Sequence, residues 1–182
     1  MTFTVKTLGD KKPDISKASY ISDGVFIAGD VKLGNNVSIW SNSSLRADLA
    51  SIIVGDNTNI QENSVIHVSW CEDWDYRKNP KGHVIIGNNT TIGHLCVIHA
   101  CKIGDNCLIG MGSIIGDDCV VEDGAFIGAG SNLTPRTLVK SGELWLGNPA
   151  RFVRNLRDAD VEYMKKDLEV YFELAKKFAI EQ

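Results

Sequence analysis

Aliphatic residues recur at every sixth position through most of this 182-residue chain, often followed directly by glycine. They form four blocks: Ile27, Leu33, Ile39 and Leu45; Val54, Ile60 and Ile66; Ile86, Ile92 and Ile98; and Ile103, Ile109, Ile115, Val121 and Ile127. A short fixed period indicates a stacked-repeat architecture. Three six-residue units make a coil of about 18 residues, so the pattern predicts a triangular prism of short parallel strands.

The position two residues before each aliphatic is mostly small or β-branched. Its members are Val25, Val31, Val37, Ser43, Ile52, Thr58, Ser64, Val84, Thr90, Cys96, Cys101, Cys107, Ser113, Cys119 and Ala125. We expect the aliphatic to fill the middle of each coil, the small residue to line a corner, and the glycine to permit a tight turn or close backbone approach. The four cysteines in this column are therefore predicted to be buried core residues.

The repeat has two important interruptions, of which the first follows Ile66. From Ile66 to Ile86 the step is 20 residues instead of 6, which predicts an extruded loop near 69–82. Long loops in compact domains are usually functional or disordered. This loop is rich in aromatic and charged residues, which favours a lid or a subunit contact: Trp70, Glu72, Asp73, Trp74, Asp75, Tyr76, Arg77 and Lys78.

The pattern changes after Pro149. Apolar residues then follow helical spacing, with Asp158 as the expected N-cap: Val161, Met164, Leu168, Phe172, Ala175 and Ala179. We predict one domain, in which residues 1–150 form the prism with its loop. Residues 151–182 are expected to form an amphipathic helix that packs along the prism.

Composition narrows the choice of partners. The net charge is −4 and the pI is near 5.5, without a Lys/Arg cluster, so neither nucleic acid nor an anionic membrane is expected as a partner. No apolar run is long enough to span a membrane, and the first twelve residues lack the apolar stretch of a secretory signal. The expected compartment is the cytoplasm.

Three histidines occupy related repeat positions. His67 and His99 follow Ile66 and Ile98 in one column, so they should project from adjacent rungs, about 4.8 Å apart, and share one metal ion. His94 precedes His99 by five residues, up to roughly 16 Å of extended chain, and is expected at a different corner. It would then bind the metal of a neighbouring chain in a three-fold assembly. His83 is expected to be a surface or corner residue.

Three neutral imidazoles are the ligand count of a catalytic zinc site, because the fourth position stays open for water. Zinc lowers the pKa of such a water to about 7 and so generates hydroxide near neutral pH. Structural zinc sites are closed and usually include thiolates. The spacing therefore predicts a zinc enzyme whose site exists only in the oligomer.

Several segments resemble the γ-class carbonic anhydrases, members of the hexapeptide-repeat family. They are Arg46-Ala47-Asp48, the run from Asn59 to His67, Gly93-His94, Val97-Ile98-His99 and 146–150. The resemblance implies a mainly β fold, a left-handed parallel β-helix of hexapeptide repeats with a C-terminal α-helix. It also implies a homotrimer that hydrates carbon dioxide reversibly to bicarbonate.

The same resemblance assigns the site residues. His67, His94 and His99 would bind zinc, with iron or cobalt as possible replacements. Gln61 would hydrogen-bond the metal-bound hydroxide that attacks carbon dioxide, and Asn59 would support it. Arg46 and Asp48 would bridge subunits and order the site, or form a purely structural interface salt bridge.

The chain departs from the most active members at Leu49, where they carry a glutamate that exports the proton. Glu72, Asp73 or Asp75 of the loop could compensate, whereas Glu62 is not obviously directed at the metal. Two alternatives stay open. One is acyl transfer or thioester hydrolysis on the same scaffold, and the other is a metal-binding but non-catalytic trimeric assembly protein.

Overall fold

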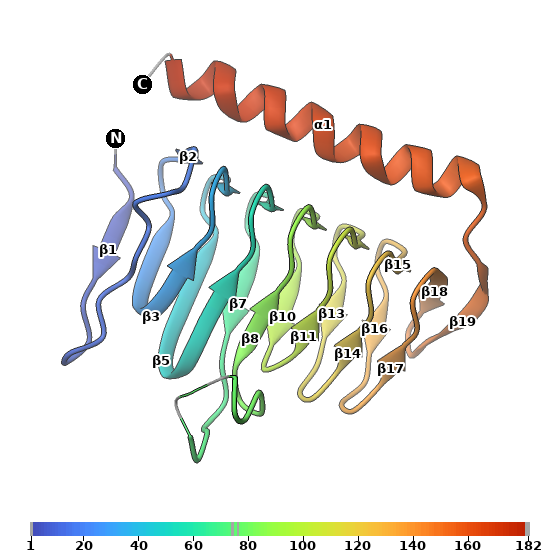
Figure 1. The fold of residues 1–182 in the computed structure, drawn as a ribbon, viewed down its shortest axis with the longest axis horizontal. Coiled ribbons are helices and arrows are strands. Elements are labelled where there is room, and N and C mark those ends of the chain that lie inside the picture. Colours follow the sequence, from blue (N-terminus) through green and yellow to red (C-terminus); the bar gives the residue numbers. More distant parts are fainter. Residues whose placement is uncertain (1, 74, 76, 181–182) are drawn as a thin grey trace.

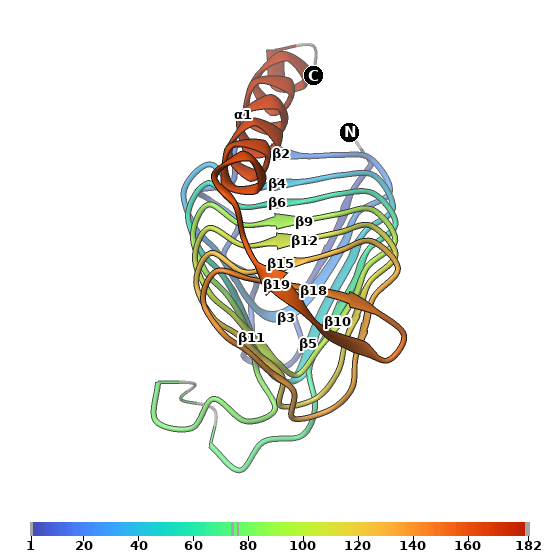
Figure 2. The ribbon, with the colours of Figure 1, turned by 90° about the vertical axis from the view of Figure 1, so that its right-hand side faces the viewer.

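The computed structural model describes residues 2–73, 75 and 77–180, and shows a left-handed parallel β-helix of triangular cross-section (Figures 1 and 2). Trp74 and Tyr76, which were predicted to belong to the loop, lie outside the described residues. Three faces, A, B and C, enclose the core. The long strands β3 (Phe26–Leu33) and β5 (Ser44–Val54) turn the corner between faces A and B and join them into one sheet.

The remaining strands are distributed over the three faces as follows. Face A holds β1 (Thr4–Lys6), β7 (Val65–His67), β10 (Val97–His99), β13 (Ile114–Ile115) and β16 (Asn132–Leu133). Face B holds β8 (Val84–Ile86), β11 (Lys102–Ile103), β14 (Val120–Val121) and β17 (Leu138–Val139). Face C holds β2 (Tyr20–Ile21), β4 (Ser38–Ile39), β6 (Asn59–Ile60), β9 (Thr91–Ile92), β12 (Leu108–Ile109), β15 (Phe126–Ile127), β18 (Glu143–Gly147) and β19 (Ala150–Asn155).

The predicted columns are confirmed. On face A the strands pair in register so that one buried aliphatic stacks on the next, in the order Ile27, Leu45, Ile66, Ile98, Ile115 and Leu133. Each of these side chains is at most 1% exposed. Because apolar burial is the main favourable term in folding, this column fixes the register of the outward-facing residues beside it.

The small column is also buried. The four repeat cysteines are at most 4% exposed, and burial raises the pKa of each thiol, to about 11 for Cys96 and Cys107. These cysteines therefore fill the core as neutral thiols, as predicted. The repeat glycines allow the backbones of neighbouring coils to approach each other closely. A Cβ on Gly87 would lie 2.5 Å from the carbonyl carbon of Gly104.

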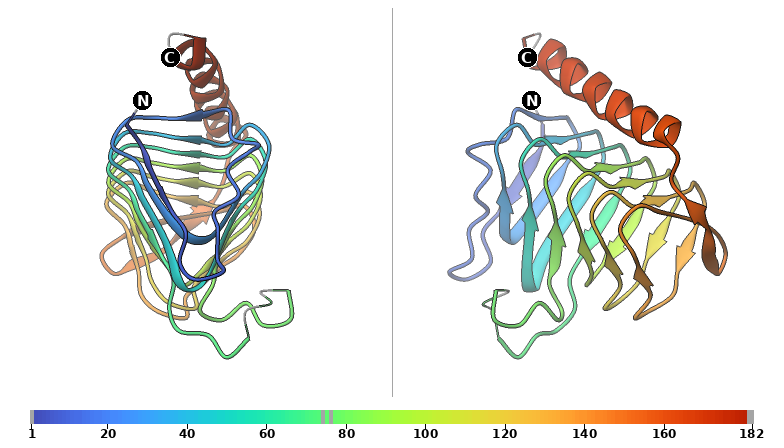
Figure 3. Two further views of the ribbon diagram at one scale, coloured as in Figure 1. Left: turned by 90° about the vertical axis from the view of Figure 1, so that its left-hand side faces the viewer. Right: turned by 45° about the vertical axis from the view of Figure 1, so that its right-hand side comes forward.

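The inserted loop projects from the corner between faces A and B (Figures 2 and 3). His83, at its end, is fully buried, so its prediction as a surface or corner residue is wrong. Its Nδ1 accepts from the Ser51 N–H at 3.0 Å, and its Nε2 lies 3.0 Å from the Asp73 carbonyl oxygen. The ring thus ties the loop to β5, a contact that the repeat pattern does not reveal.

The chain ends in a hairpin and one helix. Residues 150–155 form β19, antiparallel to β18, so the predicted helical segment 151–182 begins as a strand, and α1 spans Asp158–Ile180. The Asp160 carboxylate, not Asp158, accepts from the Arg157 N–H at 2.8 Å and closes the first turn. Helix α1 lies over face C (Figure 1), where Ala175 packs with Tyr20 and Trp40. No helix within the described residues is long and apolar enough to cross a membrane.

Candidate metal centre

His67 and His99 face each other across two paired rungs. Strand pairing places Arg46 beside His67 and His67 beside His99, the register predicted from the repeat. The Nδ1 atom of His67 lies 3.2 Å from Nε2 of His99. In a tetrahedral zinc site with Zn–N bonds of about 2.0 to 2.1 Å, two ligand nitrogens stand about 3.3 Å apart. The pair therefore has the spacing of two ligands on one ion.

Asp48 orders the first of these rings. Its Oδ1 lies 3.0 Å from Nε2 of His67, and its other oxygen accepts a hydrogen bond from the Arg46 guanidinium. Burial alone would raise the pKa of Asp48, but the hydrogen bond from His67 and the charge of Arg46 hold it below its ordinary value. Asp48 is thus an anion that turns the opposite nitrogen of His67 toward His99.

Asp117 does the same for His99, and sequence reasoning missed it. Its Oδ1 lies 2.5 Å from Nδ1 of His99, which leaves Nε2 directed at His67. The signal was present, since Asp117 is the second residue after Ile115 in the same column that located both histidines. A carboxylate on the far nitrogen is the usual outer partner of a metal-binding histidine.

His94 lies three residues before β10, at the corner between faces C and A. Leu95 turns the chain there with a φ of 59°, as Asn63 does one coil earlier. Nδ1 of His94 lies 2.7 Å from a Glu62 carboxylate oxygen, and Nε2 lies 3.2 Å from the Tyr171 hydroxyl of α1. Glu62 therefore contacts a predicted ligand, a partner that its sequence position did not indicate.

The three histidine rings are suitable ligands for zinc, but a single chain does not bring all three together. Each of the three rings has one nitrogen against a carboxylate, from Asp48, Glu62 or Asp117. Among the described residues of a single chain, no three His, Cys, Asp or Glu side chains gather as a metal-binding group. The chain carries two half-sites, the His67/His99 pair and the single His94.

Gln61 and Asn59 belong to a buried polar relay that reaches α1. The Gln61 Nε2 donates to Asn59 Oδ1 at 3.3 Å, and the Asn59 Nδ2 donates to the Thr91 hydroxyl at 2.8 Å. Thr91 in turn lies beside Asp167 of α1, whose pKa is raised by burial. Because its amide nitrogen is committed to Asn59, Gln61 retains its Oε1 as an acceptor.

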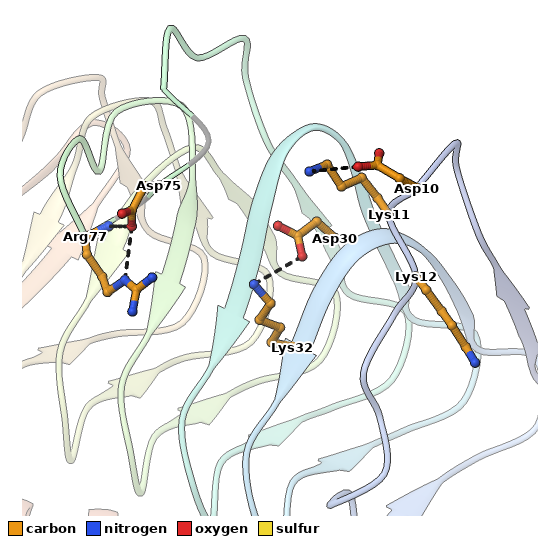
Figure 4. Close-up of a pocket in the computed structure, with 7 residues that line it drawn as sticks. All are labelled: Asp10, Lys11, Lys12, Asp30, Lys32, Asp75 and Arg77. Atoms are coloured by element: carbon orange, nitrogen blue, oxygen red, sulfur yellow. Dashed lines mark hydrogen bonds and ion pairs between the residues drawn. The ribbon is translucent and has the colours of Figure 1, made fainter.

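Two of the three loop acids that could compensate for Leu49, Asp73 and Asp75, have other local partners. Asp75 binds Arg77 at 3.0 Å, and Asp73 accepts from the Asp75 N–H at 2.9 Å. Asp75 and Arg77 line an open cleft of about 470 Å³ opposite Asp30 and Lys32 (Figure 4), and none of the described residues that line it is a histidine. Leu49 itself is 42% exposed.

Fold and site together define a class: a parallel β-helix with carboxylate-oriented histidines on adjacent rungs. A family model described as "Bacterial transferase hexapeptide (six repeats)" matches residues 100–135. The chain is 38% identical to a carbonic anhydrase of Geobacillus kaustophilus over 163 residues, covering 90% of this chain and 84% of that relative. It is also 38% identical to mitochondrial gamma carbonic anhydrase 1 of Arabidopsis thaliana, but spans only 63% of that protein's length.

Among solved structures, a hexapeptide transferase family protein from Anaplasma phagocytophilum is 40% identical, with a TM-score of 0.85 and coverage of 96% of this chain and 97% of the other. The chain belongs to the γ-class carbonic anhydrase family of hexapeptide-repeat proteins.

Each predicted histidine ligand has a carboxylate against one of its ring nitrogens. Replacing that carboxylate should weaken metal binding without removing a ligand. We expect Asp117→Asn and Glu62→Gln each to weaken zinc binding roughly 10- to 100-fold, measured by competition with a chromophoric chelator. Glu173→Gln, which alters an exposed ion pair with Lys176 on α1, is the matched control. Affinities within twofold of the unmodified protein would contradict the assignment.

Proposed function

We propose that this protein catalyses the reversible, zinc-dependent hydration of carbon dioxide to bicarbonate at sites shared between the subunits of a homotrimer. The observation that carries the proposal is the in-register His67/His99 pair, with one nitrogen of each ring held by a carboxylate and the other two 3.2 Å apart. The names of the relatives given above support the same reaction.

His67 and His99 of one subunit and His94 of the next would hold the ion, with iron or cobalt as possible replacements. Zinc bound by three imidazoles lowers the pKa of a bound water to about 7. Asp48 and Asp117 would keep their rings oriented, since each fixes one nitrogen as a donor and leaves the other as a lone pair, and the Glu62 carboxylate lies 2.7 Å from Nδ1 of His94.

Gln61 would orient the reacting solvent. Its side chain is buried, and the relay through Asn59 prevents the amide from flipping, so Oε1 can accept a hydrogen bond and direct a lone pair toward the carbon of carbon dioxide. Hydration forms one C–O bond to the oxygen of water as one C=O π bond of carbon dioxide opens, and it releases one proton. Because Leu49 supplies no titratable group, we expect the turnover to rise with the concentration of an external proton acceptor.

Face A supplies the surface for assembly. The outward residues Val65, Val97 and Ile114 form an exposed apolar row, 44%, 38% and 43% exposed, on the rungs between the His94 corner and the His67/His99 corner. Leu95 and Met111 extend this row at the His94 corner and are more than half exposed. Burial of such a patch against another copy is favourable, and it would bring the two kinds of half-site together.

Acyl transfer is the second candidate, favoured by the description of the Anaplasma phagocytophilum structure as a transferase family protein. It would use a groove, and one of about 310 Å³ lies beside face B with Lys81, Lys102 and Arg136 in its lining. This reaction gives no reason for three carboxylate-held histidines. A metal-binding but non-catalytic trimer would need the three histidines. Only a measurement of turnover distinguishes it from the proposed carbonic anhydrase.

The proposed activity is tested by stopped-flow measurement of carbon dioxide hydration on protein loaded with zinc or, anaerobically, with iron. We expect hydration that is lost in His99→Ala, because that change removes a ligand. Lys102→Ala, on the groove, is the control and should retain the rate. Zinc at one ion per chain without hydration would support the non-catalytic alternative instead.

Assembly is tested separately on face A. We expect Ile114→Arg to yield a monomer by light scattering and to lose tight zinc binding, because a desolvated unpaired charge is costly in an interface. Leu138→Arg on face B, an equally exposed site at 49%, should leave both properties unchanged. A monomeric Ile114→Arg protein that still binds zinc tightly would contradict the shared site.

A further inference from the structure

Both ring nitrogens of His94 are occupied within its own chain. Nδ1 lies 2.7 Å from a Glu62 carboxylate oxygen, and Nε2 lies 3.2 Å from the Tyr171 hydroxyl. The other two predicted ligands differ, because His67 and His99 each turn one nitrogen toward the other. A metal ion can therefore bind His94 only if one of its present contacts is released.

The contact with Tyr171 is the one to be released. The Glu62 carboxylate lies closest to the ring, 2.7 Å from Nδ1, and its negative charge disfavours a lone pair there, so the neutral ring places its proton on Nδ1 and its lone pair on Nε2. The carboxylate partner is the one that metal-binding histidines keep, as with Asp48 and Asp117. Tyr171 then donates its hydroxyl proton to the lone pair that a metal would need.

Packing holds Tyr171 in this position. Its ring lies edge-on to Trp40, with centroids 5.5 Å apart, in the cluster by which α1 rests on face C. A tyrosine hydroxyl carries its proton at neutral pH. The tyrosine therefore presents a permanent donor to His94.

Building on the proposed function, we propose that Tyr171 is a positioning residue that holds His94 in the metal-free protein and competes with the metal ion for its Nε2 atom. The exchange breaks one O–H···N hydrogen bond and forms one metal–nitrogen bond, while the phenol keeps its proton. Helix α1 is thereby coupled to metal loading, because only the ion-free state has this contact between the helix and the site.

The proposal predicts a gain of affinity. Tyr171→Phe keeps the ring and removes the competing hydroxyl, so we expect zinc binding to tighten roughly threefold to tenfold, the factor that corresponds to one net hydrogen bond. Tyr171→Leu, which also lacks the hydroxyl, should change affinity in the same direction. The control is Tyr163→Phe, since Tyr163 is 57% exposed on the same helix and stacks on Phe126.

The measurement is a chelator competition with zinc alone on the full-length protein, with circular dichroism to verify the helix. A purely structural role for Tyr171 would weaken zinc binding or leave it unchanged, and either result in both variants would overturn the proposal. If the unmodified protein binds zinc and only the predicted gain is absent, the proposed function stands without this inference. If the unmodified protein binds no zinc, both fail.

Discussion

The spacing between parallel rungs is the constraint on which the site depends. Paired strands lie about 4.8 Å apart, and the buried column through Leu45, Ile66 and Ile98 fixes which residues stand beside one another. A shift of one residue would turn His67 or His99 into the core and a buried isoleucine outward. The six-residue repeat thus brings two imidazoles to ligand spacing without a dedicated loop.

The same regularity separates the third ligand from the first two. His99 ends β10, whereas His94 lies in the turn three residues before that strand begins, where the Glu62 carboxylate lies 2.7 Å from its ring. Because the prism is rigid, a single chain cannot bring the rings of His94 and His99 to the same metal ion. The exposed apolar row on face A lies between the two half-sites, so the surface that would drive assembly is also the surface across which the ligands would meet.

The sequence allowed the prediction of features that follow the period, namely the inward columns, the buried cysteines and the His67/His99 register, and a break in the period located the loop. It failed where contacts join segments that the repeat does not relate. His83 is buried because the loop folds back on β5, and Tyr171 reaches His94 from a helix 77 residues away. Asp117 was not predicted because the residue level with His99 on the next rung is Gly116, and Asp117 lies one position beyond that column.

Mixing two inactive variants tests the shared site most directly. His94→Ala retains the His67/His99 pair, and His99→Ala retains His94, so neither variant alone can form a complete site. Trimers assembled from equal amounts of both should regain about one quarter of the zinc bound by the unmodified protein, because one interface in four joins an intact pair to an intact His94. Mixed trimers that bind no more zinc than the separate variants would contradict a site shared between subunits.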